Sequence, residues 1–397
     1  MTSARMSKPP SHPPSKRWSW RSQAFRSLVY QVLAVAVIAL LVLFLAHNTA
    51  TNMRQRGIQS GFDFLLGTAG FDIGESLFTF DSGESYLQAY LVGVTNTLRV
   101  AVLGIVLTTI LGTLIGVGRF SRNALVRGLC RVYVEAFRNI PILLQLLMWY
   151  LIFTEFLPAM AEAWEVGPFF LSKGGFNFPI PVWANGHVWA AWGLLLGVGA
   201  AVAWRKNAWS KFIATGVPHG MFWMPLGIFL ACGIAGWLLG GAPTETNFPI
   251  RGEFSVENGG SLTPEFLALL IGLTMYTAAF VAEVVRGGIQ AVPQGQAEAA
   301  SALGLSQSHS MRLVMLPQAL RVIIPPITNQ YLNLTKNSSL AVAIGYPDVV
   351  SIANTAINQT GRAVECIALI MLVYLSTSLA TSVLMNWYNA RAEIKER

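Results

Sequence analysis

Eight long apolar stretches constrain the fold of this chain more than any other feature of its sequence. About 20 predominantly apolar residues are enough for a helix to cross the hydrocarbon core of a bilayer, and a helix satisfies its own backbone polar groups there. The sequence therefore predicts an all-α polytopic membrane protein with about eight transmembrane helices. The stretches lie at roughly 28–46, 88–117, 132–157, 187–204, 219–240, 263–285, 321–345 and 365–387.

The composition agrees with a membrane protein. Of the 397 residues, 53% are hydrophobic and 12% are charged, whereas about 25% charged residues are usual in soluble domains. A net charge of +8 would suggest nucleic acid as the partner of a soluble protein. In a membrane protein, basic cytoplasmic loops explain such a charge, so no nucleic-acid partner is expected. The cysteines and histidines form no metal-ligand spacing, and we expect neither a metal nor a cofactor.

Segments outside the spans suggest how the chain is organised. Residues 1–26 are rich in Pro, Ser and Arg and predict a disordered basic cytoplasmic tail. Residues 27–84 contain the first span, which is longer than the 7–15 apolar residues of a signal peptide, and then an acidic loop that we expect to be periplasmic. Residues 158–262 form a Trp-rich insertion with two spans, and 391–397 form a short cytoplasmic tail.

The distribution of Lys and Arg predicts the orientation. Short cytoplasmic loops are enriched in basic residues, and with eight spans all the basic connections fall on one side. Both termini are therefore expected in the cytoplasm, with the chain spanning a membrane several times. The basic residues of these connections are Arg119, Arg122, Arg127, Arg131, Arg205, Lys206, Lys211, Arg286, Arg312 and Arg321.

One polar stretch, residues 294–326, separates two long apolar runs. Residues 297–303 are almost all strong helix formers, and Gly304 provides a natural helix end because glycine tolerates the left-handed conformation. We expect a second helix to open near Pro317. A short helix, a glycine turn and a second helix would form a compact knob presented to a partner.

The spacing in this stretch resembles the EAA loop of ABC-importer permease subunits: Glu-Ala-Ala, three residues, Gly, nine residues, an aliphatic residue, one residue, Leu-Pro. In that family the loop docks into a groove of the ATP-hydrolysing subunit and carries its motion into the membrane. The resemblance implies that the ATPase-coupling residues here are Glu298, Ala299, Ala300, Gly304, Leu316 and Pro317.

Four further stretches, 94–98, 133–141, 282–289 and 336–340, are similar to the polar amino-acid branch of these permeases, which serves histidine, glutamine and arginine. The resemblance covers the permease core, at 85–157 and 263–390, and implies the type I importer (MetI-like) fold with extra helices. The long insertion resembles that of the long subunit in permeases of the general L-amino-acid type, which pair two different membrane subunits.

The sequence contains no G-x-x-x-x-G-K-[ST] loop to bind ATP phosphates, and no catalytic constellation. The resemblance thus implies a transporter subunit rather than an enzyme, with ATP bound by a separate ATPase subunit. It also implies a second permease subunit, identical or different, a periplasmic solute-binding protein, an amino-acid substrate and contact with membrane lipid.

Two groups of polar residues inside spans are candidates for the substrate path. Arg99 lies about 18 Å into its span at the helical rise, where an unpaired arginine costs roughly 2.5–3.5 kcal/mol or more. Its partner is either an internal glutamate or a substrate carboxylate. The second group, Asn329, Gln330, Asn333, Lys336 and Asn337, shares one helix face just after Pro325 and Pro326. That face either lines a water-filled path or forms interhelical hydrogen bonds.

The alternative from another class is an ion-coupled secondary transporter of small polar solutes. Such a protein needs carboxylates within its spans for protons or sodium, and the sequence offers mainly Glu283 and Glu365, both near span ends. We expect Glu283 to pair with Arg286 three residues later, and Arg138 either to extend toward the membrane surface or to pair with Glu135.

Overall fold

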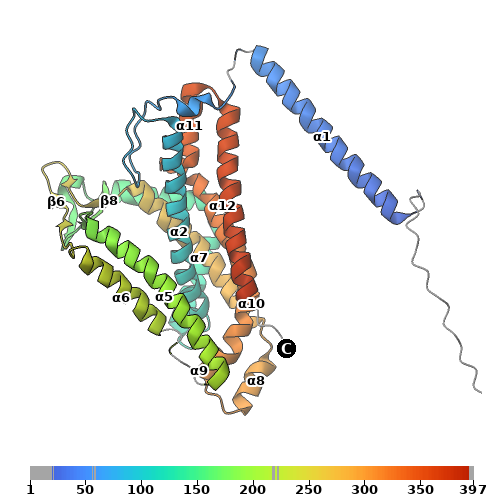
Figure 1. Ribbon diagram of the computed structural model, residues 1–397, viewed down its shortest axis with the longest axis vertical. Helices are drawn as coiled ribbons and strands as arrows, with labels where there is room; N and C mark the ends of the chain where they lie inside the picture. The colour runs from blue at the N-terminus through green and yellow to red at the C-terminus, as the bar shows by residue number, and fades with distance from the viewer. Residues whose placement is uncertain are drawn as a thin grey trace, which may run out of the picture.

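The computed structural model describes residues 20, 22–55, 57, 60–216, 220 and 223–392, and most of them are helical. Figure 1 places α11 at one end of the molecule and α8 and α9 at the other, and we name the two ends after these helices. The helices are α1 (Gln23–Gln55), α2 (Tyr86–Gly118), α3 (Ala124–Asn139), α4 (Ile142–Leu151), α5 (Asn185–Thr215), α6 (Trp223–Leu239), α7 (Pro264–Gln290), α8 (Gln294–Ala302), α9 (Gln307–Ser310), α10 (Leu316–Asn337), α11 (Val349–Thr360) and α12 (Ala363–Ala392).

The predicted helical membrane fold is confirmed, and each of the eight apolar stretches contains helix among its described residues. Five of them, α1, α2, α5, α7 and α12, are single helices long and apolar enough to span a membrane. Two more are bent pairs, and the eighth, α6, has 17 residues. Several helices extend beyond the predicted spans. Helix α1 starts at Gln23, inside the stretch predicted to be a disordered tail, while residues 1–19, 21 and 393–397 of the two tails lie outside the described residues.

Helices α2 and α7 pack along a ladder of small residues that sequence analysis did not single out. Thr108, Gly112 and Gly116 recur every four residues of α2, are buried and lie against α7, whereas Gly104, one step earlier in the same row, lies against Leu334 of α10. A Cβ atom at Gly112 would lie 2.7 Å from the Val281 side chain and 2.9 Å from the Ala278 carbonyl oxygen. Small residues at such spacing let the backbones of two membrane helices approach closely, and this contact forms the centre of the core.

The third predicted span, 132–157, is broken rather than continuous. Helix α3 ends at Asn139, and the segment that continues from Ile142 is bent away from it by 105°. Pro141 causes the break, because a residue before proline is disfavoured in the helical conformation, and Ile140 is extended. The Gln145 amide compensates by donating to the carbonyl oxygens of Phe137 and Ile140 at 2.9 and 2.8 Å.

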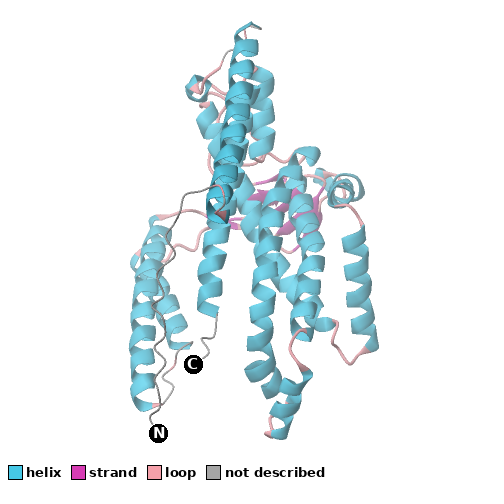
Figure 2. Cartoon of the chain, turned by 90° about the vertical axis from the view of Figure 1, so that its right-hand side faces the viewer, coloured by secondary structure: helices cyan, strands magenta, loops and turns pink. Residues whose placement is uncertain are grey.

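The Trp-rich insertion contains short strands that the all-α prediction did not anticipate. The strands β1 (Trp164–Val166), β2 (Phe169–Ser172), β3 (Gly175–Phe178) and β8 (Gly260–Leu262) pair antiparallel in that order. Two two-stranded ladders, β4 (Ile180–Pro181) with β5 (Thr246–Asn247) and β6 (Ile250–Arg251) with β7 (Val256–Glu257), complete it. The strands are two to four residues long, too short for a period-two pattern to stand out. Figure 2 shows them gathered beside the helices.

The rest of the insertion is a helical hairpin of α5 and α6. Its helices meet at glycines: a Cβ atom at Gly193 would lie 2.3 Å from the carbonyl oxygen of Cys232, and one at Gly236 equally close to that of Trp189. The hairpin thus uses the same close packing of small residues as the α2–α7 contact.

Candidate functional site

The polar knob, which we define as residues 294–310, projects at the α8 end (Figure 1). Helix α8 runs from Gln294 to Ala302, close to the predicted helix over 297–303. Gly304 follows with a φ of +77°, the left-handed conformation that the sequence analysis required of it. The Leu305 N–H donates to the Ala300 carbonyl at 3.1 Å, which closes the turn.

The second helix of this region starts earlier than predicted. It begins at α9, where the Ser306 hydroxyl accepts from the N–H of His309, and it continues through a π-helical turn, Met311–Met315, into α10. Pro317 therefore lies inside a continuous helical segment rather than at its opening. Proline has no N–H to donate to the preceding turn, and that turn is the π-helical one, of the single-turn kind that occurs inside α-helices.

The residues predicted to couple the chain to an ATPase differ in exposure. Glu298, Ala299, Gly304 and Leu316 are exposed, whereas Ala300 is buried. Side-chain hydrogen bonds between described residues tie the knob to the bundle: Gln318 Nε2 donates to Gln296 Oε1 at 3.2 Å, and Arg122 Nη2 donates to Gln307 Oε1 at 2.8 Å. The described residues thus hold the knob by one face and leave the carboxylate of Glu298 accessible to a partner.

The polar face of α10 is largely uncovered. Asn329, Asn333 and Lys336 are exposed, and Gln330 and Asn337 are half-buried, while Tyr331, Leu334 and Thr335 on the opposite face are buried against the bundle. Among the described residues, the three asparagine side chains make no hydrogen bond. This face is therefore available to a neighbouring subunit or a solute, and its role in a substrate path stays a prediction.

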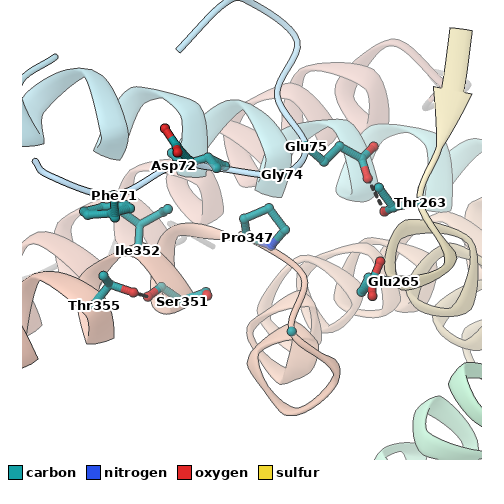
Figure 3. A pocket seen from close by; sticks show the side chains of 12 residues that line it. Phe71, Asp72, Gly74, Glu75, Thr263, Glu265, Pro347, Ser351, Ile352 and Thr355 are labelled. Carbon is teal, nitrogen blue, oxygen red and sulfur yellow. Dashed lines mark hydrogen bonds between the residues drawn. The ribbon is translucent and has the colours of Figure 1, made fainter. Parts of the chain in front are cut away.

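Arg99 binds a carboxylate from a distant part of the chain. Its Nη1 lies 2.5 Å from Glu75 Oε1, and its guanidinium carbon lies 4.2 Å from the centre of the Phe266 ring. Glu75 belongs to the segment before α2 and also accepts a hydrogen bond from Thr263, the residue that caps α7 (Figure 3). Arg99 therefore lies level with the first turn of α7, although counting residues along α2 placed it near the bilayer middle.

The internal glutamate was one of the two partners considered for Arg99, and no sequence signal identified Glu75 among the loop carboxylates. Glu75 borders a cavity of about 350 Å³ that Asp72 and Glu265 also line (Figure 3). Its backbone carbonyl accepts from Asn96 Nδ2 at 2.8 Å. The pair joins α2, α7 and the 60–85 segment at one point.

Removing one member of this buried pair is expected to destabilise the fold. Arg99→Met leaves the Glu75 carboxylate buried without its counter-charge, which costs about 3–5 kcal/mol. The double variant Arg99→Met/Glu75→Gln removes both charges and should recover most of that loss. Thermal unfolding of the purified full chain in detergent measures both. A double variant no more stable than Arg99→Met would contradict the pairing as the source of the effect.

The carboxylates that a secondary transporter would need are engaged in the fold. Glu283 binds both Arg119 and Arg286, and Arg138 Nη1 lies 3.9 Å from it. The pair with Arg286 is as predicted, while Arg138 turns to Glu283 rather than to Glu135. Glu365 Oε1 accepts from the Gly61 N–H at 2.7 Å. Asp348, a buried carboxylate that the sequence analysis did not name, caps α11 by accepting from Ser351 N–H at 2.9 Å.

These features define a helical membrane protein that exposes a polar knob between two of its spans. The family model described as "Binding-protein-dependent transport system inner membrane component" matches residues 108–394. The chain belongs to this family, which confirms the resemblance found in the sequence.

Three curated relatives match nearly the whole chain. The general L-amino acid transport system permease protein AapQ of Rhizobium johnstonii is 46% identical over 387 residues, covering 96% of each chain. The putative amino-acid ABC transporter permease protein YhdX of Escherichia coli is 44% identical and covers 96% of this chain and 97% of its own. The glutamate/glutamine/aspartate/asparagine transport system permease protein BztB of Rhodobacter capsulatus is 40% identical, covering 94% and 95%. Because the matches cover 94–96% of the chain, they include most or all of the insertion.

Proposed function

We propose that this chain is a permease subunit of an ATP-driven amino-acid importer and that the knob couples it to a separate ATPase subunit. The observation that carries the proposal is the exposed helix α8 with Glu298 accessible, held to the bundle through its other face. The names of the three relatives support amino acids as the substrate class. The engaged carboxylates Glu283 and Glu365 disfavour the ion-coupled alternative.

The mechanism is a mechanical one. ATP binding closes the ATPase dimer, and the knob moves with the groove that holds it. Because α9, the π turn and α10 form one helical segment, motion of the knob reaches the polar face of α10 directly. The spans rock so that the path opens outward to receive an amino acid from a periplasmic binding protein, and hydrolysis of ATP returns the path to its inward-facing state.

Purification of the tagged chain from its native membranes tests the proposal. We expect an ATPase subunit with a P-loop to co-purify. If the permease pair is heteromeric, a second permease subunit should co-purify as well. ATPase activity of the complex should rise when the binding protein loaded with an amino acid is added. A stable preparation that contains no ATPase would refute the coupling role.

The same proposal has the chain span the inner membrane, with both termini and the knob on the cytoplasmic side. The α8 end of the bundle carries Arg119, Arg122 and Arg286, and the α11 end carries Asp63, Asp72 and Glu75. This distribution agrees with the enrichment of basic residues on the cytoplasmic side.

Labelling of introduced cysteines tests this orientation. Ser308→Cys in the knob is expected to react with a membrane-impermeant thiol reagent only after the cells are opened. Asp72→Cys, beyond the opposite end of α2, should react in cells whose outer membrane alone is permeabilised. Both residues are exposed, and Asp72 also borders the cavity beside Glu75, so the reagent can reach them. The reverse pattern of labelling would overturn the orientation.

A further inference from the structure

A cavity lined by four arginines lies where the end of α2, the first half of α3 and the end of α7 meet. Its volume is about 320 Å³, and its charged lining residues are Arg119, Arg127, Arg131 and Arg286. They come from three segments: the residue that ends α2, the first half of α3, and the last turns of α7. Phe120, Ala124, Gly128 and Gln290 complete the lining.

Among the described residues, these arginines have few counter-charges. No carboxylate of the described part of the chain lines the cavity. Glu283, which is not among the lining residues, binds Arg119 and Arg286, and the one hydrogen bond or ion pair that the Arg127 side chain makes with another described residue runs from its Nη1 to the Ser121 carbonyl, at 3.0 Å. Among the described residues Arg131 has no hydrogen-bond or ion-pair partner, and Glu135, one turn along α3, forms no ion pair with it. Four guanidinium groups around one hollow repel one another unless an anion fills it.

The chemistry of the lining identifies the anion. Guanidinium groups present planar, bidentate donors that match phosphate oxygens. A volume of this size exceeds the roughly 30 Å³ share of a water molecule about tenfold, so it holds a phosphate group together with several waters. We propose that this cavity binds a phosphate group, whose source is either the headgroup of an anionic phospholipid or a soluble phosphate.

Helix α3 favours the lipid headgroup as the source. Leu125, Leu129 and Val132, each 62–69% exposed, share the face of α3 opposite to Arg127 and Arg131. A helix with an apolar face and an arginine face is typical of helices that lie in the membrane interface, where lipid phosphates are found. Basic pockets between membrane helices are also known to bind phosphorylated lipid headgroups.

The cavity adjoins the connection to the knob. Arg122, in the loop between α2 and α3, donates to Gln307 of α9, and Arg119 and Arg127 flank that loop. A phosphate bound among the arginines therefore orders the loop that contacts the knob.

Native mass spectrometry of the full chain tests the proposal, with phosphatidylglycerol and phosphatidylcholine as the probes. Wild-type protein is expected to retain one phosphatidylglycerol in preference to phosphatidylcholine. The variant Arg127→Gln/Arg131→Gln should reduce this retention about tenfold or more, because it removes two charge-assisted contacts. The control Arg205→Gln/Lys206→Gln removes the same charge from exposed positions of α5 and should retain the lipid as wild type does.

A second measurement distinguishes the two sources. Inorganic phosphate is titrated against lipid-depleted wild-type protein, with thermal unfolding as the readout and the same two double variants alongside. Stabilisation by inorganic phosphate without selective lipid retention identifies a soluble phosphate as the ligand, provided Arg127→Gln/Arg131→Gln abolishes it. The proposal would be overturned if wild type and both double variants retained the lipid equally and responded equally to phosphate. It would also be overturned if the two double variants lost lipid retention and phosphate response to the same extent.

Discussion

Reversing the charge of Glu298 is expected to abolish amino-acid uptake while leaving the chain folded in the membrane. Glu298 is exposed on α8 and forms no ion pair with any described residue, so Glu298→Lys should change stability by no more than about 0.5 kcal/mol. At the proposed interface, the substitution removes the contact between Glu298 and the ATPase subunit, and the new lysine repels that subunit. We expect the binding free energy to weaken by about 2–5 kcal/mol. Uptake of labelled amino acid and recovery of the ATPase subunit should both fall by about 100-fold.

The matched control is Glu135→Lys. It makes the same charge change on an exposed position of α3, at the same end of the bundle but outside the knob. We expect the control to retain uptake and to co-purify with the ATPase. Normal uptake by Glu298→Lys would exclude the knob as the coupling element, and a similar loss in both variants would point to general charge rather than docking.

The second large effect is expected from the small-residue ladder between α2 and α7. Gly112→Val places a branched side chain where a single Cβ already meets Val281 and the Ala278 carbonyl within 3 Å. Because a backbone atom blocks it, a change of rotamer cannot make room, and the two helices have to separate. We expect a loss of about 3 kcal/mol, the upper part of the range for overpacking, and little folded protein in the membrane.

Gly199→Val tests whether this effect belongs to the ladder. Gly199 lies in the interior of α5, and no atom lies within 4 Å of the position that a Cβ atom would take there. Valine at this site should therefore change stability by no more than about 0.5 kcal/mol. Thermal unfolding in detergent and the amount of chain in the membrane fraction measure both variants. If Gly112→Val unfolds at the temperature of wild type, the contact between α2 and α7 is not the centre of the core.

The helices and the knob are predictable because their signals are local. Long apolar runs directly predict helices that span a bilayer, and Gly304 predicts the left-handed turn that ends a short helix. The sequence predicts that the helix after Gly304 begins near Pro317, because proline is typical of the first turn of a helix. The helix instead begins after the Ser306 cap and runs through the π turn and past Pro317 as one segment. The break at Pro141 has a readable signal, a proline within an apolar run, although the prediction left that span undivided.

Other features had no local signal. The partner of Arg99 is 24 residues away in the sequence, in a loop with four other carboxylates, and only the packing of that loop against α2 and α7 selects Glu75. The strands of the insertion are formed by pairing of β3 with β8, which more than 80 intervening residues separate, and each strand alone is too short to reveal a pattern.

The sequence by itself determined that this chain crosses a membrane several times and presents one polar knob, since hydropathy and turn chemistry act over a few neighbouring residues. The tertiary structure decided which charges are neutralised within the described part of the chain and which stay exposed. Ion pairs such as Arg99–Glu75 and Arg119–Glu283 depend on where distant helices meet, and a short window of sequence contains no information on that distance. The same packing gathers four arginines around one cavity and leaves Glu298 exposed.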